Sequence, residues 1–195
     1  MTHGDRRKWE DRYRAAETGL RPPSTLLASW IDSLPCGRAL DLASGDGRHA
    51  LFLAARGFRV DAIDIAAAGL QRLLAAARSA DLSVQVVQAD LEHYALPRDR
   101  YDVVVAIRYL QRSLFEQMRR TVRPGGVVIV ETFLIDQRQI GHPTNPDFLL
   151  EHGELRAHFH GFDVLVWEEG LCATEGAPAY LARLIARRPH AAGLD

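Results

Sequence analysis

Glycines and carboxylates in one short stretch of the chain are suited to binding a polar or charged ligand head. The segment from Asp41 to Arg48 contains Gly45 and Gly47, separated by a single residue. Glycines let the backbone turn sharply and let a ligand come close to backbone N–H groups. A helix that begins directly after the turn points the positive end of its dipole at that ligand. A Gly-x-Gly turn alone is weak evidence, because a tight turn after any buried strand can need it.

Two further carboxylates stand where the next predicted strands end. Asp64 closes an apolar run at residues 58–64, and Asp90 follows another at residues 83–89. The carboxylate of Asp64 can accept hydrogen bonds from ribose hydroxyls, and that of Asp90 can accept one from the exocyclic amine of adenine. A purely structural role for Asp64, capping the helix that follows, is the alternative. Three strand ends with such groups at one sheet edge favour the ligand-binding interpretation.

The elements that must position these residues alternate between strand and helix, the pattern of βαβ units and a parallel sheet. We predict strands at residues 38–43, 58–64, 83–89, 101–107, 127–132, 162–168 and 179–187, and helices at about 48–56, 66–80 and 110–122. Only about ten residues separate the last two strands, too few for a parallel crossover, so they should form an antiparallel hairpin. The predicted fold class is α/β, a Rossmann-like, seven-stranded, mostly parallel sheet with an antiparallel last strand and helices on both faces.

Two segments lie outside this alternation in a chain of 195 residues, a length that fits one domain. Residues 1–34 place Trp9 and Tyr13 among charged residues, and residues 134–160 form a polar insertion with glycine and prolines. Open α/β sheets bind ligands beyond the carboxyl ends of their strands, and both segments can cover that edge. We therefore expect an N-terminal lid segment over residues 1–34 and a ligand-binding domain over 35–195, with a lid insertion at about 134–160.

Five stretches together resemble the motifs of class I S-adenosylmethionine-dependent methyltransferases. They are residues 40–48, 60–64, 88–91, 101–105 and 123–126. The resemblance covers about residues 36–188, and the antiparallel last strand is a further feature of that fold. It implies an enzyme that uses S-adenosylmethionine as its cofactor and transfers its methyl group.

A closer resemblance is to tellurite-resistance-type methyltransferases and their small-molecule relatives. These carry an N-terminal Trp-x-x-x-Tyr segment, matched by Trp9 and Tyr13, and a Gly-x-Gly-Arg turn, matched by Gly45, Gly47 and Arg48. The resemblance implies a small-molecule methyl acceptor. One position departs from the family pattern, because Ala43 stands where a first glycine is usual. An alanine is tolerable there with a negative φ, but its side chain narrows the approach of the methionine head.

The resemblance also implies cofactor-binding residues, grouped by the part of the cofactor that each meets. They are Asp41 and the backbone of Ala43, Ser44, Gly45 and Gly47 for the methionine part; Asp64 for the ribose; Ile65, Asp90 and Leu91 for adenine; Ile107 and Arg108 near the sulfonium; and Trp9 and Tyr13 as a cover.

Methyl transfer from a sulfonium is a direct displacement, in which the cofactor supplies reactivity and the protein supplies approach geometry. A base is needed only for an acceptor that must first lose a proton, so no catalytic residue is assigned. Tyr109, Arg138 and His142 fall in regions that can face an acceptor, with a surface or structural role as the alternative for each. Asn145-Pro146 resembles part of an amino-group methylation motif, but that motif follows the fourth strand, so we interpret it as a turn.

Two other functions compete with this interpretation. The sequence Gly45-x-Gly47-x-x-Ala50 also fits the loose fingerprint of a nicotinamide cofactor, which would make the protein a small NAD(P)-binding oxidoreductase. Asp41 inside the first strand, Asp90 and the antiparallel last strand argue against it. The second alternative is a module that binds the cofactor and performs no chemistry.

Composition argues against two kinds of partner, nucleic acid and membrane. A net charge of −1 without blocks of like charge argues against a nucleic-acid partner. No apolar run approaches the roughly 18 residues that span a membrane, and no secretory signal is seen, so we expect a cytoplasmic protein without a membrane partner. Cys36, Cys172 and the eight histidines show no metal-site spacing, so no metal is expected. The oligomeric state is not predicted.

Overall fold

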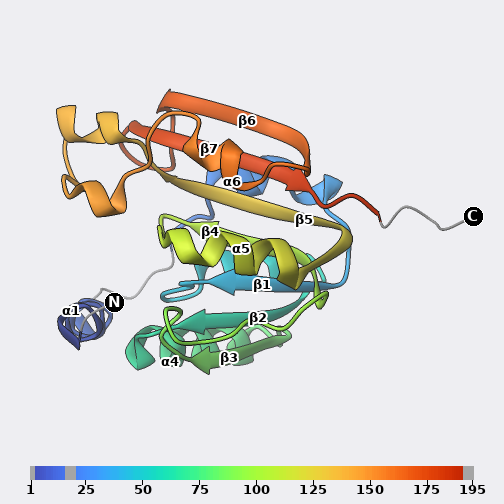
Figure 1. The fold of residues 1–195 in the computed structure, drawn as a ribbon. Helices are drawn as coiled ribbons and strands as arrows, with labels where there is room; N and C mark the ends of the chain where they lie inside the picture. Colours follow the sequence, from blue (N-terminus) through green and yellow to red (C-terminus); the bar gives the residue numbers. More distant parts are fainter. Residues whose placement is uncertain (1–2, 16–20, 191–195) are drawn as a thin grey trace, which may run out of the picture.

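The computed structural model describes residues 3–15 and 21–190 and contains one seven-stranded sheet in the order β3-β2-β1-β4-β5-β7-β6 (Figure 1). The strands are β1 (Arg38–Leu42), β2 (Arg59–Asp64), β3 (Val84–Gln88), β4 (Tyr101–Ile107), β5 (Val122–Phe133), β6 (Asp163–Cys172) and β7 (Ala179–Arg187). β1 to β5 pair in parallel, and β7 pairs antiparallel with both β5 and β6. The predicted fold class is therefore confirmed, including the antiparallel last strand.

Helices cover both faces of the sheet. They are α1 (His3–Ala15), α2 (Thr25–Trp30), α3 (Arg48–Ala54), α4 (Ala67–Ser79), α5 (Arg112–Thr121) and α6 (Glu154–His158), with 3-10 turns η1 (Ile31–Ser33), η2 (Ile135–Gln139) and η3 (Pro146–Phe148). α2, α3 and α4 contribute to one apolar cluster, and α5 and α6 contribute to another. Val103 and Val105 of β4 join the first cluster, whereas Val104 joins the second. This run of valines is thus buried on both faces, as a central parallel strand requires.

The observed strands differ from the predicted ones mainly where pairing extends an element beyond its apolar run. β5 begins at Val122, so residues 123–126, which precede the strand predicted at 127–132, lie inside it. Tyr101 pairs with Val122 ahead of a register shift, and this pairing recruits the glycine-containing stretch into the strand. β6 continues to Cys172, because each of its last residues has a partner in β7. Hydrogen-bonded partners that are distant in sequence determine where β5 begins and where β6 ends, so local composition does not predict these boundaries.

The N-terminal segment divides into two parts with different positions. α1 lies beyond the carboxyl ends of β1 to β3, at the left of Figure 1, where Glu10 Oε2 accepts a hydrogen bond from the backbone N–H of Ala68 at 3.2 Å. α2 and η1 instead bury Leu26, Leu27 and Ile31 in the core cluster shared with α3. Part of the predicted lid segment therefore packs in the core, and only α1 lies over the edge. The division into a lid and a domain stays a prediction.

The insertion after β5 is anchored by apolar side chains at both of its ends. Leu134 and Leu150 form an isolated parallel bridge, and both are fully buried. Leu149, next to Leu150, is buried as well, whereas residues 138–140 and 144–148 are exposed. None of the helices in the described ranges is both long and apolar enough to cross a membrane.

Candidate functional site

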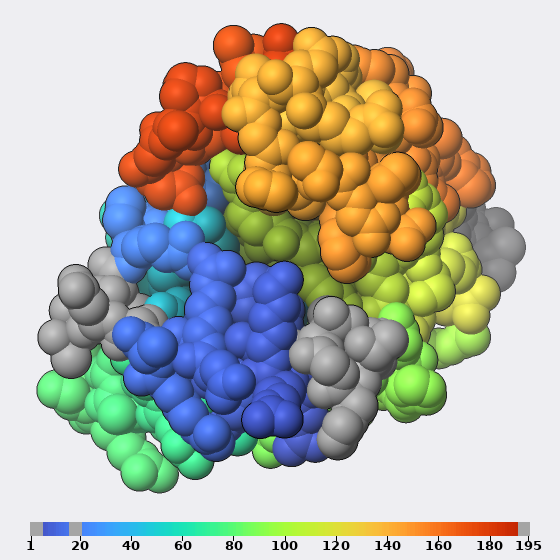
Figure 2. Space-filling model, turned by 90° about the vertical axis from the view of Figure 1, so that its left-hand side faces the viewer, coloured from blue at the N-terminus to red at the C-terminus, as the bar shows by residue number. Residues whose placement is uncertain are grey.

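The candidate site lies at the carboxyl ends of β1 and β4, where the strand order reverses. β1 is flanked by β2 on one side and β4 on the other, and such a reversal opens a crevice in α/β sheets. Leu42 pairs with Ala106, so the turn after β1 lies beside Ile107 and Arg108. Figure 2 shows this face, with α1 in dark blue and the insertion in yellow to orange on opposite sides of a recess. The structure thus brings the predicted glycine turn and the end of β4 together.

The turn after β1 contains three residues with left-handed backbone conformations. Gly45 has φ +59° and Gly47 has φ +87°, values that glycine adopts at no steric cost. Ala43 has φ +54°, so the negative φ that would make an alanine tolerable there is not found. A left-handed conformation costs a residue with a Cβ about 1–2 kcal/mol. This conformation explains why glycine suits the position, and it makes Ala43 a strained residue at the site.

Tyr13 of α1 lies directly on the glycine turn. A Cβ added to Gly45 would clash with the Tyr13 hydroxyl, and one added to Gly69 would lie 3.1 Å from the Tyr13 ring. Trp9 stacks behind Tyr13, with ring centroids 6.0 Å apart and an interplanar angle of 24°. Burial, followed by the nearby charges of Asp64 and Asp46, raises the pKa of the Tyr13 phenol. The two aromatic residues predicted as a cover are therefore located at the predicted cofactor-binding turn.

Asp64 connects the end of β2 to the glycine turn. Its Oδ2 accepts a hydrogen bond from the Gly45 N–H at 2.8 Å, and its Oδ1 accepts one from the Ala66 N–H, also at 2.8 Å. The second bond is to the residue just before α4, which has no side-chain cap, so Asp64 orders this turn without the capping role considered for it. Burial raises the pKa of this carboxyl, while the backbone hydrogen bonds act in the opposite direction. Each carboxylate oxygen keeps a second acceptor position, so the structural contacts leave Asp64 able to bind a ligand.

Three buried polar atoms close to this turn have no hydrogen-bond partner among the described residues: Asp41 Oδ2, Ser44 Oγ and His49 Nε2. Asp41 is 1% exposed, and burial raises the pKa of its carboxyl to about 7. An unpaired buried polar group lowers the free energy of unfolding by roughly 1–3 kcal/mol, so a bound ligand that supplies the missing hydrogen bond is expected at such a group. A ligand with an ammonium group and further polar atoms, such as the methionine part of S-adenosylmethionine, would provide partners for Asp41 and Ser44. The residues present therefore fit the predicted cofactor.

Sequence reasoning missed His49, which lies in the first turn of α3. Its side chain is 5% exposed. Burial, together with the positive charges of Arg48, Arg21 and Arg108, lowers the pKa of the imidazole to about 3. A histidine at the start of a helix carries no distinctive signal in the sequence, because a surface role is equally consistent with its position.

The predicted adenine-binding residues lie around the end of β3. Leu91 is buried, Ile65 is half-buried, and Asp90 Oδ1 accepts a hydrogen bond from the Glu92 N–H at 3.0 Å. The backbone N–H of Ala89 donates to the carbonyl oxygen of Asp64 at 3.0 Å, which keeps the ends of β3 and β2 adjacent.

Asp90, Glu92 and His93 could supply metal ligands within 4.8 Å of one another, but the last two are exposed, and such exposed groups are common without an ion.

Arg108 follows β4 in a left-handed conformation, with φ +61°. Its backbone N–H donates to the Glu131 carbonyl at 2.7 Å, and its Nε donates to Glu131 Oε1 at 3.0 Å. Its guanidinium lies 4.7 Å from the centroid of the Phe133 ring. Glu131 is fully buried, and its Oε2 also accepts from Arg183 Nε at 2.8 Å and from Ser24 Oγ at 3.1 Å. The one signal for Glu131 in the sequence is a single carboxylate within the apolar run of β5.

The loop between β6 and β7 reaches the helix that follows the glycine turn. Arg48 donates to the Pro22 carbonyl oxygen at 3.0 Å and forms an ion pair with Glu175 of this loop. Sequence reasoning missed this contact, since its partners are far apart in the chain. The loop thus forms another side of the site, next to residues 21–24.

The three residues considered as acceptor-facing lie in different surroundings. The Tyr109 hydroxyl donates to Gln111 Oε1 at 2.6 Å, directly after β4. Arg138 and His142 are exposed on the insertion. Asn145 Oδ1 accepts from the Asp147 N–H at 3.1 Å as η3 begins, which places Asn145 in a turn, as interpreted.

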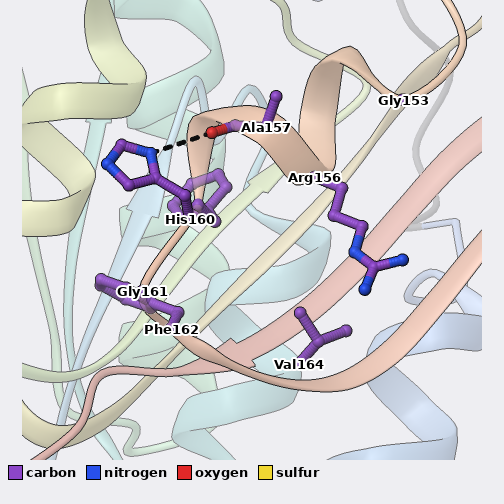
Figure 3. A pocket seen from close by; sticks show the side chains of 8 residues that line it. Gly153, Arg156, Ala157, His160, Gly161, Phe162 and Val164 are labelled. Atoms are coloured by element: carbon purple, nitrogen blue, oxygen red, sulfur yellow. Dashed lines mark hydrogen bonds between the residues drawn. The ribbon is translucent and has the colours of Figure 1, made fainter.

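A separate hollow lies between α6 and the start of β6 (Figure 3). It is lined by Gly153, Arg156, Ala157, Phe159, His160, Gly161, Phe162 and Val164. His160 Nδ1 is hydrogen-bonded to the Ala157 carbonyl oxygen at 3.1 Å, and the Arg156 side chain lies on the opposite side of the view. None of the predicted site residues lines this hollow, and its polar groups do not converge on one point.

A family of known proteins matches the part of the chain that contains the glycine turn. Residues 39–126 match the methyltransferase domain family, over the segment that runs from β1 through the glycine turn to the start of β5. This match and the fold agree with the predicted class of S-adenosylmethionine-dependent methyltransferases and with the predicted cofactor, S-adenosylmethionine.

Two solved structures share this fold, and one curated protein is similar in sequence. TehB from Haemophilus influenzae has a TM-score of 0.71 at 20% identity, over 84% of this chain and 61% of that chain. An S-adenosylmethionine-dependent methyltransferase from Mesorhizobium loti has a TM-score of 0.66 at 19% identity, over 84% of this chain and 98% of that one. Hemagglutinin 1 of Eikenella corrodens is 27% identical over 169 residues, which are 80% of this chain and 55% of that protein. The chain therefore spans little more than half of this last relative and under two thirds of TehB.

Proposed function

We propose that this protein transfers a methyl group from S-adenosylmethionine to a small-molecule acceptor by direct displacement. The observation that carries the proposal is the set of unpartnered buried atoms on Asp41, Ser44 and His49, beside the turn of a methyltransferase domain. A small acceptor is supported by the cover over this edge, where Tyr13 contacts the turn and Glu175 contacts Arg48. A macromolecular acceptor would have to displace these contacts. A cytoplasmic location and the absence of nucleic-acid and membrane partners remain part of this proposal.

Each part of the cofactor has candidate partners in the proposal. The Asp41 carboxylate would accept from the ammonium of the methionine part, beside the backbone of residues 43–47. Asp64 would accept from the ribose hydroxyls through the positions that Gly45 and Ala66 leave free. Ile65 and Leu91 would contact adenine, and Asp90 would accept from its amine.

The chain's own residues would mainly orient the reactants and exclude water. When bound, S-adenosylmethionine supplies an electrophilic methyl group on a positively charged sulfur. Arg108, held by Glu131 at the end of β4, would position an acceptor beside the turn, and Trp9 and Tyr13 would keep solvent away. No described side chain is assigned as a general base.

A transfer assay tests the proposal. The protein is incubated with methyl-labelled S-adenosylmethionine and fractionated cell extract, and the label is followed into low-molecular-weight, protein and nucleic-acid fractions. We expect label in the low-molecular-weight fraction alone. Asp64→Ala should reduce transfer roughly tenfold or more, because hydrogen bonds to the ribose and to Gly45 are lost. Asp32→Ala, at an exposed position, should leave transfer unchanged.

Other distributions of label would decide against the proposal. Label in protein or nucleic acid would contradict the small-molecule acceptor and retain the chemistry. Cofactor binding without any transfer, across extracts and acceptor panels, would favour the module that binds the cofactor and performs no chemistry.

A further inference from the structure

Arg108, at the end of β4, has a guanidinium group of which one edge makes no hydrogen bond within the described residues. Arg108 Nε is bound to Glu131, and the group is stacked over Phe133. Within the described ranges, neither terminal amino group of Arg108 donates to a protein acceptor. The side chain is 21% exposed, so these two groups can reach a ligand at the edge of the sheet.

The surroundings of Arg108 fix this group in place. Glu131, with no exposed surface, is held in turn by Arg183 and Ser24. The left-handed φ of Arg108 is unfavourable for a residue with a side chain, and such strain persists where the surrounding structure over-determines it. A guanidinium that is anchored and stacked has little freedom left to lose when it binds a ligand, and this preorganisation favours binding.

His49 offers a second unused group, and it lies close enough to Arg108 for the charge of that side chain to act on its imidazole. The pairing of Leu42 with Ala106 puts the end of β4 beside the turn that leads into α3 and His49. His49 Nε2 is buried and has no partner among the described residues. With a lowered pKa, the imidazole is neutral at pH 7 and can donate one hydrogen bond, depending on its tautomer.

We propose that Arg108 and His49 bind a carboxylate group of the methyl acceptor. This inference rests on the proposed function and specifies its substrate class, small organic acids. The free edge of a guanidinium holds two parallel N–H donors that match the two oxygens of a carboxylate. One guanidinium with a free donor edge and one neutral imidazole suit a monoanion, whereas a phosphate dianion calls for more positive charge.

Charges of both signs lie around this place. Glu131 is paired with Arg108 and Arg183, and Glu175 is paired with Arg48 through Oε1, whereas Glu175 Oε2 is buried without a partner among the described residues. Arg21 adds a further positive charge whose influence reaches His49. The sulfonium of the cofactor would repel a cationic acceptor and attract an anionic one.

The test is an NMR titration of the full chain in the presence of saturating S-adenosylhomocysteine. The probes are acetate, benzoate, inorganic phosphate and methylammonium, and the observed signals are the Arg108 side-chain N–H groups and the His49 ring. We expect both carboxylates to bind saturably, phosphate to bind more weakly, and methylammonium not to bind. Arg108→Gln should weaken benzoate binding about tenfold or more, because the charge-assisted pair is lost. Arg120→Gln, an exposed position on α5, should leave it unchanged.

The outcomes separate this inference from the proposed function. If S-adenosylhomocysteine binds but the carboxylates do not, or phosphate or methylammonium binds more tightly than they do, the inference is wrong and the proposed function stands. If S-adenosylhomocysteine does not bind at all, the proposed function itself is contradicted. Should Arg108→Gln unfold, His49→Phe, which removes the unpartnered Nε2, serves instead. Unchanged benzoate affinity in that variant would overturn the inference.

Discussion

At the scale of single residues, the candidate site contains strained backbones and buried polar atoms without partners, and both lower the stability of the fold. Ala43 and Arg108 have left-handed backbones, and Asp41, Ser44 and His49 keep unpartnered buried atoms. Strain and unsatisfied polar groups persist at functional sites, where a ligand provides the missing contacts. The residue types at strand ends could be predicted from the sequence. Their backbone conformations could not, because φ at Ala43 is set by how the turn closes on Asp64 and Gly45.

Ala43→Gly should stabilise the protein by roughly 0.5–1 kcal/mol, since relief of the left-handed strain exceeds the extra entropy of an unfolded glycine. In thermal unfolding this corresponds to a rise of about 1–4 °C. Ala55→Gly is the matched control, because Ala55 has φ −64° and gains nothing from glycine. A lower melting temperature for Ala43→Gly would contradict the strain at this turn.

The raised pKa of Asp41 predicts a pH dependence of cofactor binding. Its carboxyl has a pKa of about 7 in the fold, raised by burial from 3.8. A bound ammonium favours the ionised form, so binding releases a proton below about pH 7 and weakens as the pH falls. Calorimetry at pH 8 and pH 5 should show roughly tenfold or greater loss of S-adenosylhomocysteine affinity. Asp41→Asn should bind weakly at both pH values.

The same shift predicts the pH dependence of stability without ligand. The folded state keeps the Asp41 proton up to about pH 7, whereas the unfolded state releases it near pH 3.8. This group therefore favours folding at low pH, and that contribution is lost as the pH rises from about 4 to 7. Between pH 4 and pH 8 the free energy of unfolding of the parent protein should therefore fall relative to that of Asp41→Asn. Parallel stability curves for the two proteins would contradict a raised pKa.

At the scale of elements, the alternation of apolar runs located the strands, and long-range pairing set their ends. The antiparallel hairpin followed from the short connection between two apolar runs, and β6 and β7 have that pairing. The core position of α2 was not predicted, because a six-residue helix is too short for a clear helical period. The ion pairs of Arg108 with Glu131 and of Arg48 with Glu175 join elements that are distant in sequence, so no local sequence pattern predicts them.

The position of α1 predicts a role in turnover that is separable from folding. Trp9→Ala with Tyr13→Ala removes the rings over the glycine turn and leaves both core clusters intact. We expect methyl transfer to fall about tenfold to a hundredfold through loss of positioning and water exclusion, with little change in melting temperature. Arg7→Ala, an exposed position on the same helix, is the control. Unchanged kinetics in the double variant would reject the lid.

The buried Glu131 links β5 to β4, β7 and the start of α2, so its removal should destabilise the whole domain. Glu131→Gln removes the charge that pairs with Arg108 and Arg183. Breaking such a buried pair costs about 3 kcal/mol, measurable by denaturant unfolding. Glu116→Gln, which breaks an exposed pair with Arg120 on α5, should change stability by at most about 0.5 kcal/mol. Equal effects of the two substitutions would contradict the role of Glu131.

At the scale of the whole molecule, one sheet edge collects the groups that sequence reasoning found on separate strands. The order β3-β2-β1-β4-β5 puts the glycine turn between the end of β2, with Asp64, and the end of β4, with Arg108. Parallel strands joined by right-handed crossovers make this order expected once the alternation is recognised. The cover over the edge is assembled from α1, residues 21–24 and the β6–β7 loop, and its makeup required the structure.

Calorimetric titration of the purified protein with S-adenosylhomocysteine, with NAD as the parallel ligand, decides which cofactor the glycine turn binds. We expect saturable binding of S-adenosylhomocysteine at one site and no saturable binding of NAD. Binding of NAD without binding of S-adenosylhomocysteine would contradict it.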